Sequence, residues 1–257
     1  MRIVRYERKG RIHWGVLDSK DSEYVREGVG DFLGDWGLTK KTYRTDSVKI
    51  LVPVLPSKVV ALGLNYRDHA EELNLPIPED PMIFLKPSTA VIGHGEPIIY
   101  PKMAGRVDYE AELGIVIGKK AKEIPPENAQ EFILGYTCVN DVTARDLQAK
   151  DVQYTRAKGF DTFCPLGPCI HTSIDPSNLK VEAYLNGKLV QSSSTSNLIF
   201  GVLELVSFVS HVMTLLPGDV ISTGTPGGIG PMQPGDIIEI RVEGIGSLVN
   251  PVMASPD

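Results

Sequence analysis

The sequence predicts a mainly β protein of the α+β class, a mixed β-sandwich or rolled sheet that carries a few helices. The 257 residues include 25 glycines and 19 prolines, an excess over average usage that favours many turns and short strands over a helix bundle. Strand-like runs also fail to alternate regularly with helices, which argues against a doubly wound parallel sheet. This length suits one large domain, or one ordinary domain with a small appendage.

The first part of the chain is predicted to be a small β-rich unit. Residues 2–7 and 11–17 are strand-like runs on either side of a turn that contains glycine, the pattern of a hairpin. Polar, glycine-rich sequence follows, and Pro53 and Pro56 then bracket a linker. The predicted division is a small N-terminal β-rich unit and a main domain, residues 1–54 and 55–257. The N-terminal unit carries no obvious chemistry, so we expect it to pack against the main domain or to cover it.

In the main domain, short apolar runs bounded by glycine or proline predict strands. These runs are residues 59–63, 82–86, 112–117, 135–139, 181–185, 219–222 and 237–242. Three segments have a helical pattern: 66–73, 126–132 and 199–216. The last is the longest apolar stretch of the chain, but Glu204 and His211 interrupt it, so we expect a buried helix and no transmembrane span.

The charge balance excludes several classes of partner. Aspartate and glutamate outnumber lysine and arginine by 32 to 26, for a formal charge of −6, so we expect no binding to nucleic acid and none to a membrane surface. No export segment is recognisable near the N-terminus. Three cysteines without a C-x-x-C pair suit a reducing compartment. We therefore expect a cytoplasmic protein whose cysteines are small core side chains.

The strongest chemical signal is a group of three carboxylates. Glu110 and Glu112 are two residues apart, so on a strand they project to the same face and repel unless a cation lies between them or one is protonated. Asp141 ends another predicted strand. Three carboxylates with waters suit a hard divalent cation, and because zinc-like His/Cys spacing is absent we expect Mg²⁺ or Mn²⁺. An exposed acidic edge strand is the alternative.

A second group could transfer protons. His69 and Glu72 are three residues apart on a predicted helix and can touch. A carboxylate that holds one imidazole nitrogen orients the ring and raises the basicity of the other nitrogen. An ordinary pair on an amphipathic helix is the alternative.

Other polar residues near these motifs could bind an anion. Near the triad, Arg145 and Lys158 would offset the negative charge of the carboxylates and, with Gln148, could hold an anionic substrate; surface salt bridges are the alternative. The stretch 223–230 is rich in glycine and includes Thr225, so it could cradle a carboxylate or an oxyanion, or form a tight turn.

Six motifs, in this order, make residues 56 to 252 similar to the fumarylacetoacetate hydrolase family. They are G-L-N-Y-R-D-H-A-E-E (63–72), F-L-K-P-S-T-A (84–90), D-Y-E-A-E-L-G-I-V-I-G (108–118), N-D-V-T-A-R-D-L-Q (140–148), K-G-F-D-T-F-C-P-L-G-P (158–168) and T-G-T-P-G-G-I-G (223–230). The first 54 residues resemble the short N-terminal unit of the smaller bacterial and archaeal members. The resemblance implies the mixed β-sandwich roll of the family's C-terminal domain, and a homodimer.

The resemblance also implies a role for each candidate site residue. Glu110, Glu112 and Asp141 match the family's ligands for Mg²⁺ or Mn²⁺. His69 and Glu72 match a catalytic dyad on a lid helix, and Lys158 matches a catalytic lysine at the substrate. The matches to substrate-binding positions are Arg145, Gln148, Thr225 and Lys86.

The predicted activity is metal-dependent chemistry on 2-oxo or enol acids through a stabilised enolate. Hydrolysis of a C–C bond in an acylpyruvate is the first expectation, with His69 activating water. Isomerisation or decarboxylation of 2-hydroxyhepta-2,4-diene-1,7-dioate-like diacids or of oxaloacetate uses the same enolate and stays open. A non-catalytic module that binds 2-oxo acids is the alternative from another class, and a purely structural β-sandwich would leave the clustered polar motifs unexplained.

Overall fold

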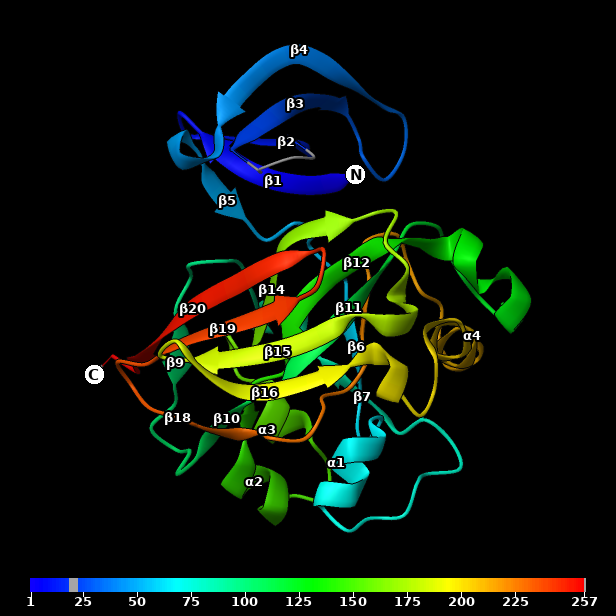
Figure 1. Ribbon diagram of the computed structural model, residues 1–257, viewed down its shortest axis with the longest axis vertical. Helices are drawn as coiled ribbons and strands as arrows, with labels where there is room; N and C mark the ends of the chain where they lie inside the picture. Colours follow the sequence, from blue (N-terminus) through cyan, green and yellow to red (C-terminus); the bar gives the residue numbers. More distant parts are fainter. Residues whose placement is uncertain (19–22, 257) are drawn as a thin grey trace.

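The computed structural model describes residues 1–18 and 23–256. Figure 1 shows the N-terminal strands as a layer on one end of a larger β body. These strands are β1 (Arg2–Arg8), β2 (Arg11–Leu17), β3 (Tyr24–Gly30), β4 (Trp36–Arg44) and β5 (Lys49–Leu51). Most of the regular structure is β, so the predicted fold class is confirmed.

The larger body contains the remaining strands and the helices. Its strands are β6 (Val59–Leu62), β7 (Ile83–Lys86), β8 (Val91–Ile92), β9 (Ile98–Tyr100), β10 (Val107–Tyr109), β11 (Ala111–Ile117), β12 (Ile133–Asn140), β13 (Thr143–Ala144), β14 (Cys164–His171), β15 (Lys180–Leu185), β16 (Lys188–Ser194), β17 (Val220–Ser222), β18 (Gly230–Met232), β19 (Ile237–Val242) and β20 (Gly246–Ala254). Its α-helices are α1 (Arg67–Glu72), α2 (Arg145–Lys150), α3 (Thr155–Lys158) and α4 (Val202–Val212). Short 3₁₀ turns are η1 (Thr45–Ser47), η2 (Ser88–Ala90), η3 (Pro126–Phe132), η4 (Pro176–Asn178) and η5 (Thr195–Asn197).

One sheet runs through both parts of the molecule, in the order β4-β3-β2-β1-β14-β12-β11-β17-β6-β7. The N-terminal strands join it where β1 pairs antiparallel with β14, with Ile3 opposite Ile170. A second sheet, β16-β15-β19-β20-β9, packs against β11, β12 and β14. In its sheet β11 lies between β12 and β17, and β15 and β19 of the second sheet pack against it. All its residues are buried, which explains its nearly continuous apolar sequence.

The helical predictions differ from the structure in extent. Segment 199–216 is helical only over α4, because Ile199 donates its backbone N–H to the carbonyl of Asn65, with N···O 2.8 Å, and Leu198 bridges to Tyr66. This extended start anchors the chain that leads into α1. Segment 126–132 is the 3₁₀ turn η3. No helix in the described parts of the chain is long and apolar enough to cross a bilayer.

Several strands have no clear sequence pattern. In β14, Pro165 and Pro168 interrupt the apolar run, and proline is uncommon inside sheets because it cannot donate to the ladder. In β4, exposed and half-buried residues follow one another and none is buried, so no apolar run marks the strand.

The cysteines Cys138, Cys164 and Cys169 are buried and free, as expected.

Candidate active site

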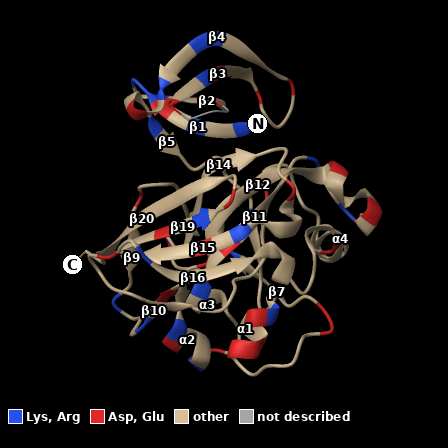
Figure 2. Ribbon diagram, viewed as in Figure 1, with Lys and Arg blue, Asp and Glu red and all other residues tan. Residues whose placement is uncertain are grey.

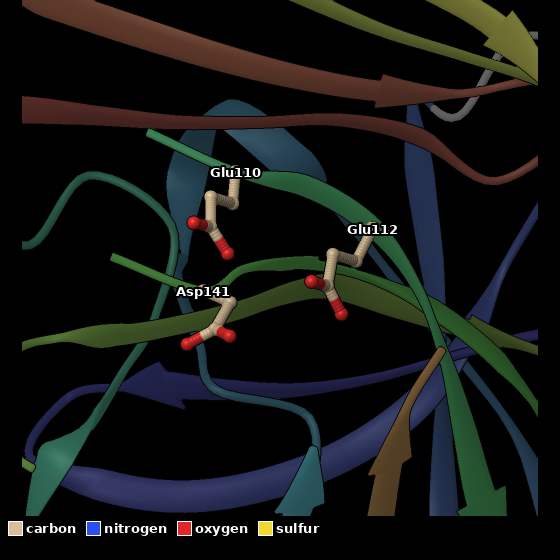
Figure 3. Close-up of side chains that lie close together, drawn as sticks. All are labelled: Glu110, Glu112 and Asp141. Atoms are coloured by element: carbon tan, nitrogen blue, oxygen red, sulfur yellow. The ribbon is translucent and has the colours of Figure 1, made fainter. Parts of the chain in front are cut away.

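The sheet brings the three predicted carboxylates together. β11 and β12 pair antiparallel, with Ala111 opposite Asn140, so Glu110, which precedes β11, lies beside Asp141, which follows β12. Glu112 comes from the start of β11. Figure 3 shows the three side chains close together, and one oxygen of each lies within 4.8 Å of the others. All three residues are buried, so the alternative of an exposed acidic edge is wrong.

Three cations neutralise two of these carboxylates. Lys158 Nζ lies 2.7 Å from Glu110 Oε2 and 2.7 Å from Asp141 Oδ2, and Arg145 Nη2 donates to Glu110 Oε1 at 2.5 Å. Lys86 is fully buried, does not line the cavity and donates to Asp141 Oδ1. Burial alone would raise the pKa of Glu110, but Lys158 and Arg145 lower it to about 2. Burial alone would lower the pKa of Lys158, but Asp141 and Glu110 raise it above the ordinary lysine value.

Glu112 has a different environment. Its Oε2 accepts from Ser222 Oγ at 2.5 Å and from the Gly224 N–H at 2.8 Å. Its Oε1 is buried and has no hydrogen-bond partner among the described residues. Burial, then the charges of Asp141 and Glu110, raise the pKa of Glu112 well above its ordinary value. An unpartnered oxygen facing two like charges is what a divalent cation would satisfy, and an all-oxygen donor set suits Mg²⁺ or Mn²⁺.

The imidazole dyad forms on α1. His69 Nδ1 lies 3.0 Å from Glu72 Oε2, and His69 is 7% exposed. The glycine-rich loop holds the carboxylate in turn, because the Gly228 backbone nitrogen lies 3.2 Å and 3.1 Å from the two Glu72 oxygens. With Nδ1 engaged, Nε2 is the ring nitrogen that can exchange a proton with a bound molecule.

His69 of the dyad and Glu110 of the triad line one cavity of about 310 Å³. Its polar wall contains His69, Glu110, Arg145, Gln148, Lys158 and Thr225. Its apolar wall contains Leu62, Leu64, Leu73, Leu75, Met82, Phe84, Tyr154 and Ile229. Figure 2 shows the acidic positions of α1 and the basic positions of α2 and α3 at the same end of the body, away from the N-terminal strands.

The other predicted residues have unequal access to this cavity. Gln148 Oε1 accepts from Arg145 Nη1 at 2.6 Å, which leaves the Gln148 amide hydrogens for a ligand. The Thr225 hydroxyl donates to the Ala111 carbonyl at 3.0 Å and accepts from Gln191 Nε2 at 3.0 Å. Lys86 does not line the cavity; its ammonium reaches Asp141 and, at 3.1 Å, the Val142 carbonyl.

Sequence reasoning missed several supporting residues. Asp108 is fully buried and accepts from Arg145 Nε at 2.9 Å, which fixes the guanidinium against Glu110. Asn140 accepts the Glu110 N–H at 2.9 Å. Asp108 stands two residues before Glu110 in the same acidic motif, a signal that could have found it; Ser222 carries no such signal.

Comparison with known proteins places these residues in a family context. Residues 58–253 match the sequence model described as Fumarylacetoacetate (FAA) hydrolase C-terminal, and residues 1–53 match that of the Rv2993c-like N-terminal domain. Protein Rv2993c of Mycobacterium tuberculosis is 49% identical, over 98% of this chain and 98% of that protein. The mitochondrial oxaloacetate tautomerase Fahd2a of Rattus norvegicus is 41% identical, over 80% of this chain and 70% of that protein.

Solved structures have the same fold. The 5-carboxymethyl-2-hydroxymuconate delta-isomerase of Mycobacterium smegmatis matches with a TM-score of 0.93 and 46% identity, over 99% of this chain and 100% of that one. The maleylpyruvate hydrolase of Sphingobium sp. SYK-6, solved with manganese(II) and pyruvate, matches with a TM-score of 0.82 and 27% identity, over 100% of both chains.

Proposed function

Because the chain belongs to the fumarylacetoacetate hydrolase family, we propose that its cavity catalyses metal-dependent proton transfer at C3 of a 2-oxo acid, interconverting keto and enol forms. The observation that carries this proposal is that His69, which is paired with Glu72, lines the same cavity as Lys158 and Glu110, a member of the acidic triad. A base beside a site for negative charge is what enolisation requires.

We assign the metal to the three carboxylates. Glu110, Glu112 and Asp141 would hold Mg²⁺ or Mn²⁺, which when bound would act as a Lewis acid toward the developing negative charge. The buried, unpartnered Glu112 Oε1 supports this assignment. Lys86 is then a positioning residue, because its ammonium fixes the Asp141 carboxylate and does not face the substrate.

Polar side chains of the cavity wall bind and orient the substrate acid. Lys158 is 3% exposed and lines the cavity, so its ammonium adds positive charge beside the substrate's C2 oxygen. Gln148 offers its amide hydrogens, since Arg145 occupies its carbonyl oxygen. Thr225 shapes the wall, because its hydroxyl already donates to Ala111.

His69 moves the proton. With Glu72 accepting from Nδ1–H, the neutral ring has a basic Nε2. The C3–H bond of the keto acid breaks, the proton goes to Nε2, and the electron pair moves through C2 to give the enolate oxygen. That oxygen takes a proton from solvent water, and the ring releases the proton on Nε2 to solvent, which gives the enol and restores the neutral imidazole. The reverse sequence returns the keto acid. A general base of this kind contributes about 10²–10⁴ in rate.

Two relatives with isomerase-type names favour isomerisation over hydrolysis: the 41% identical oxaloacetate tautomerase and the 46% identical 5-carboxymethyl-2-hydroxymuconate delta-isomerase. Hydrolysis of an acylpyruvate is the second candidate, supported by the fold shared with maleylpyruvate hydrolase. In that reaction His69 would deprotonate a water molecule. Decarboxylation of oxaloacetate would pass through the same enolate.

One experiment separates these reactions. The purified protein is incubated in D₂O with 2-oxobutanoate, oxaloacetate and an acylpyruvate, with Mg²⁺ or with a chelator, and NMR follows deuterium entry at C3. We expect Mg²⁺-dependent exchange faster than any bond cleavage. Release of pyruvate without prior exchange would favour the hydrolase, and binding without exchange or cleavage would favour the non-catalytic module.

A further inference from the structure

We propose that the cavity selects 2-oxo acids whose arm beyond C4 is an uncharged hydrocarbon, and that Met82 is a specificity-determining residue for this choice. The proposal rests on the proposed function, because it takes the carboxylate and C2 oxygen of the substrate to lie at the acidic triad. It goes further, because it states where on the substrate a second carboxylate is accepted: close to the triad, and not on the arm beyond C4.

The charged groups of the cavity are gathered at one end. Among the described residues that line it, the lysine and arginine side chains are Lys158 and Arg145, and both donate to Glu110, at 2.7 Å and 2.5 Å. Any substrate carboxylate that binds to these two side chains therefore lies close to the triad. A four-carbon diacid is short enough to keep both its carboxylates there, whereas a six-carbon diacid is not.

The remaining wall is hydrocarbon. Leu73 and Leu75 come from the segment that follows α1, and Met82 precedes β7. These three side chains are 46%, 50% and 47% exposed, so they form the open side of the cavity. A hydrocarbon arm would remove this apolar surface from water, with a gain of about fourfold in binding per methylene.

Phe84 marks the boundary between the two ends. Lys158 Nζ lies 5.0 Å from the centre of the Phe84 ring, a cation–π distance. The Tyr154 ring meets the Phe84 ring edge to face, with 5.5 Å between centroids and 80° between planes. The ammonium thus has Glu110, Asp141 and an aromatic face around it, and the aromatic pair continues the wall away from the charge.

The wall position of Met82 depends on a glycine. The Gly63 N–H donates to the Met82 carbonyl, with N···O 2.8 Å, which fixes the backbone of Met82 beside the cavity. A Cβ at Gly63 would lie 2.2 Å from Met82 Cε. The thioether methyl therefore occupies space that any other residue at position 63 would fill, and both residues line the cavity.

Matched substrates test the proposal. 2-Oxohexanoate and 2-oxoadipate have six carbons each and differ by a terminal methyl against a terminal carboxylate. A carboxylate against the apolar wall loses water without gaining a partner, so C3 exchange measured by NMR in D₂O should have a kcat/KM for 2-oxohexanoate higher by on the order of 10–100-fold. Oxaloacetate and 2-oxobutanoate, with four carbons each, should differ by less.

A charge placed on the wall should reverse the preference. We expect Met82→Lys to raise kcat/KM for 2-oxoadipate and to lower it for 2-oxohexanoate, changing their ratio by at least about tenfold. Leu75→Lys, at a position that is 50% exposed, should act in the same direction. Met253→Lys is the matched control: Met253 is 52% exposed on β20 and outside the cavity wall, so the ratio should not change.

The outcomes separate this proposal from the proposed function. Exchange with 2-oxoadipate equal to or faster than with 2-oxohexanoate, or a ratio unmoved in both lysine variants that fold, overturns the selectivity while leaving enolisation intact. No exchange with any of the four acids in the presence of Mg²⁺ would instead overturn the proposed function.

Discussion

Lys158 joins two carboxylates from different strand ends: its Nζ lies 2.7 Å from Glu110 Oε2 and 2.7 Å from Asp141 Oδ2. Glu112, the third member of the triad, receives no such cation from the described chain and keeps one oxygen unpartnered. The triad is thus neutralised unevenly, with the deficit of positive charge at Glu112.

Removal of the Glu112 charge should weaken metal binding. In Glu112→Gln the site loses a charged oxygen ligand, and we expect the Kd for Mn²⁺ measured by isothermal titration calorimetry to rise on the order of 10²-fold. Glu131→Gln, at an exposed glutamate, is the control and should bind as the unmodified protein does. Equal affinity in both variants would place the metal elsewhere.

Loss of the Lys158 ammonium should destabilise the metal-free protein. Lys158→Met leaves the buried Glu110 and Asp141 carboxylates facing each other, at a cost of about 3–5 kcal/mol in the free energy of unfolding. Added Mg²⁺ should restore part of the lost free energy of unfolding, because the metal ion then neutralises the carboxylates in place of the ammonium. Denaturant unfolding measures both effects. The exposed Lys150→Met is the control, and an equal loss in the two variants would contradict the role of Lys158.

The glycine loop should control the dyad. Gly228 has φ +92°, and a Cβ there would lie 2.7 Å from the Val190 carbonyl oxygen, so Gly228→Ala must shift the N–H that holds Glu72. We expect C3 exchange to fall about tenfold or more. Gly235→Ala is a matched control, because Gly235 has φ +101° but open space around its Cβ position. If both variants lose activity equally, backbone strain alone explains the effect.

Acid should weaken the junction between β6 and β17. Asp219 is fully buried and accepts from Lys58 Nζ at 2.5 Å, from Ser57 Oγ at 2.6 Å and from the Leu216 N–H at 2.8 Å. Burial alone would raise the pKa of Asp219, but Lys58 and Ser57 lower it below its ordinary value of 3.8. A lowered carboxyl pKa contributes stability above the unfolded pKa, and that stability is lost as pH falls through the folded value.

Asp219→Asn should therefore lower the free energy of unfolding at pH 7 by about 1.5–3 kcal/mol. The difference from the unmodified protein should shrink below about pH 4, where the native carboxyl also takes up protons. Urea unfolding across this pH range measures it, and a difference that is constant with pH would contradict the assignment.

The sequence predicted the triad because its geometry is local. Glu110 and Glu112 are two residues apart, and Asp141 follows the strand that pairs with theirs, so the strand ends bring all three together. The partners of Glu112 could not be predicted in this way, because Ser222 comes 110 residues later and reaches Glu112 only through the pairing of β11 with β17. The position of Lys86 could not be predicted either, because its ammonium reaches Asp141 only through the folded arrangement of the strands.

The fold was predictable to a similar degree. Strands with apolar runs, such as β11 and β19, follow the expected segments, whereas the prolines of β14 and the exposed residues of β4 obscure those two strands in the sequence.

The homodimer that the resemblance implies stays a prediction, and light scattering of the purified protein measures its oligomeric state.

The most direct test of the central claim is solvent deuterium exchange at C3 of a 2-oxo acid by the Mg²⁺-loaded protein and by its His69→Ala variant. If His69 is the base, exchange should be rapid with the unmodified protein and slower by about 10²–10⁴ with the variant, while calorimetry shows that the variant still binds Mn²⁺ normally. Exchange at an undiminished rate in a folded His69→Ala protein would contradict the account.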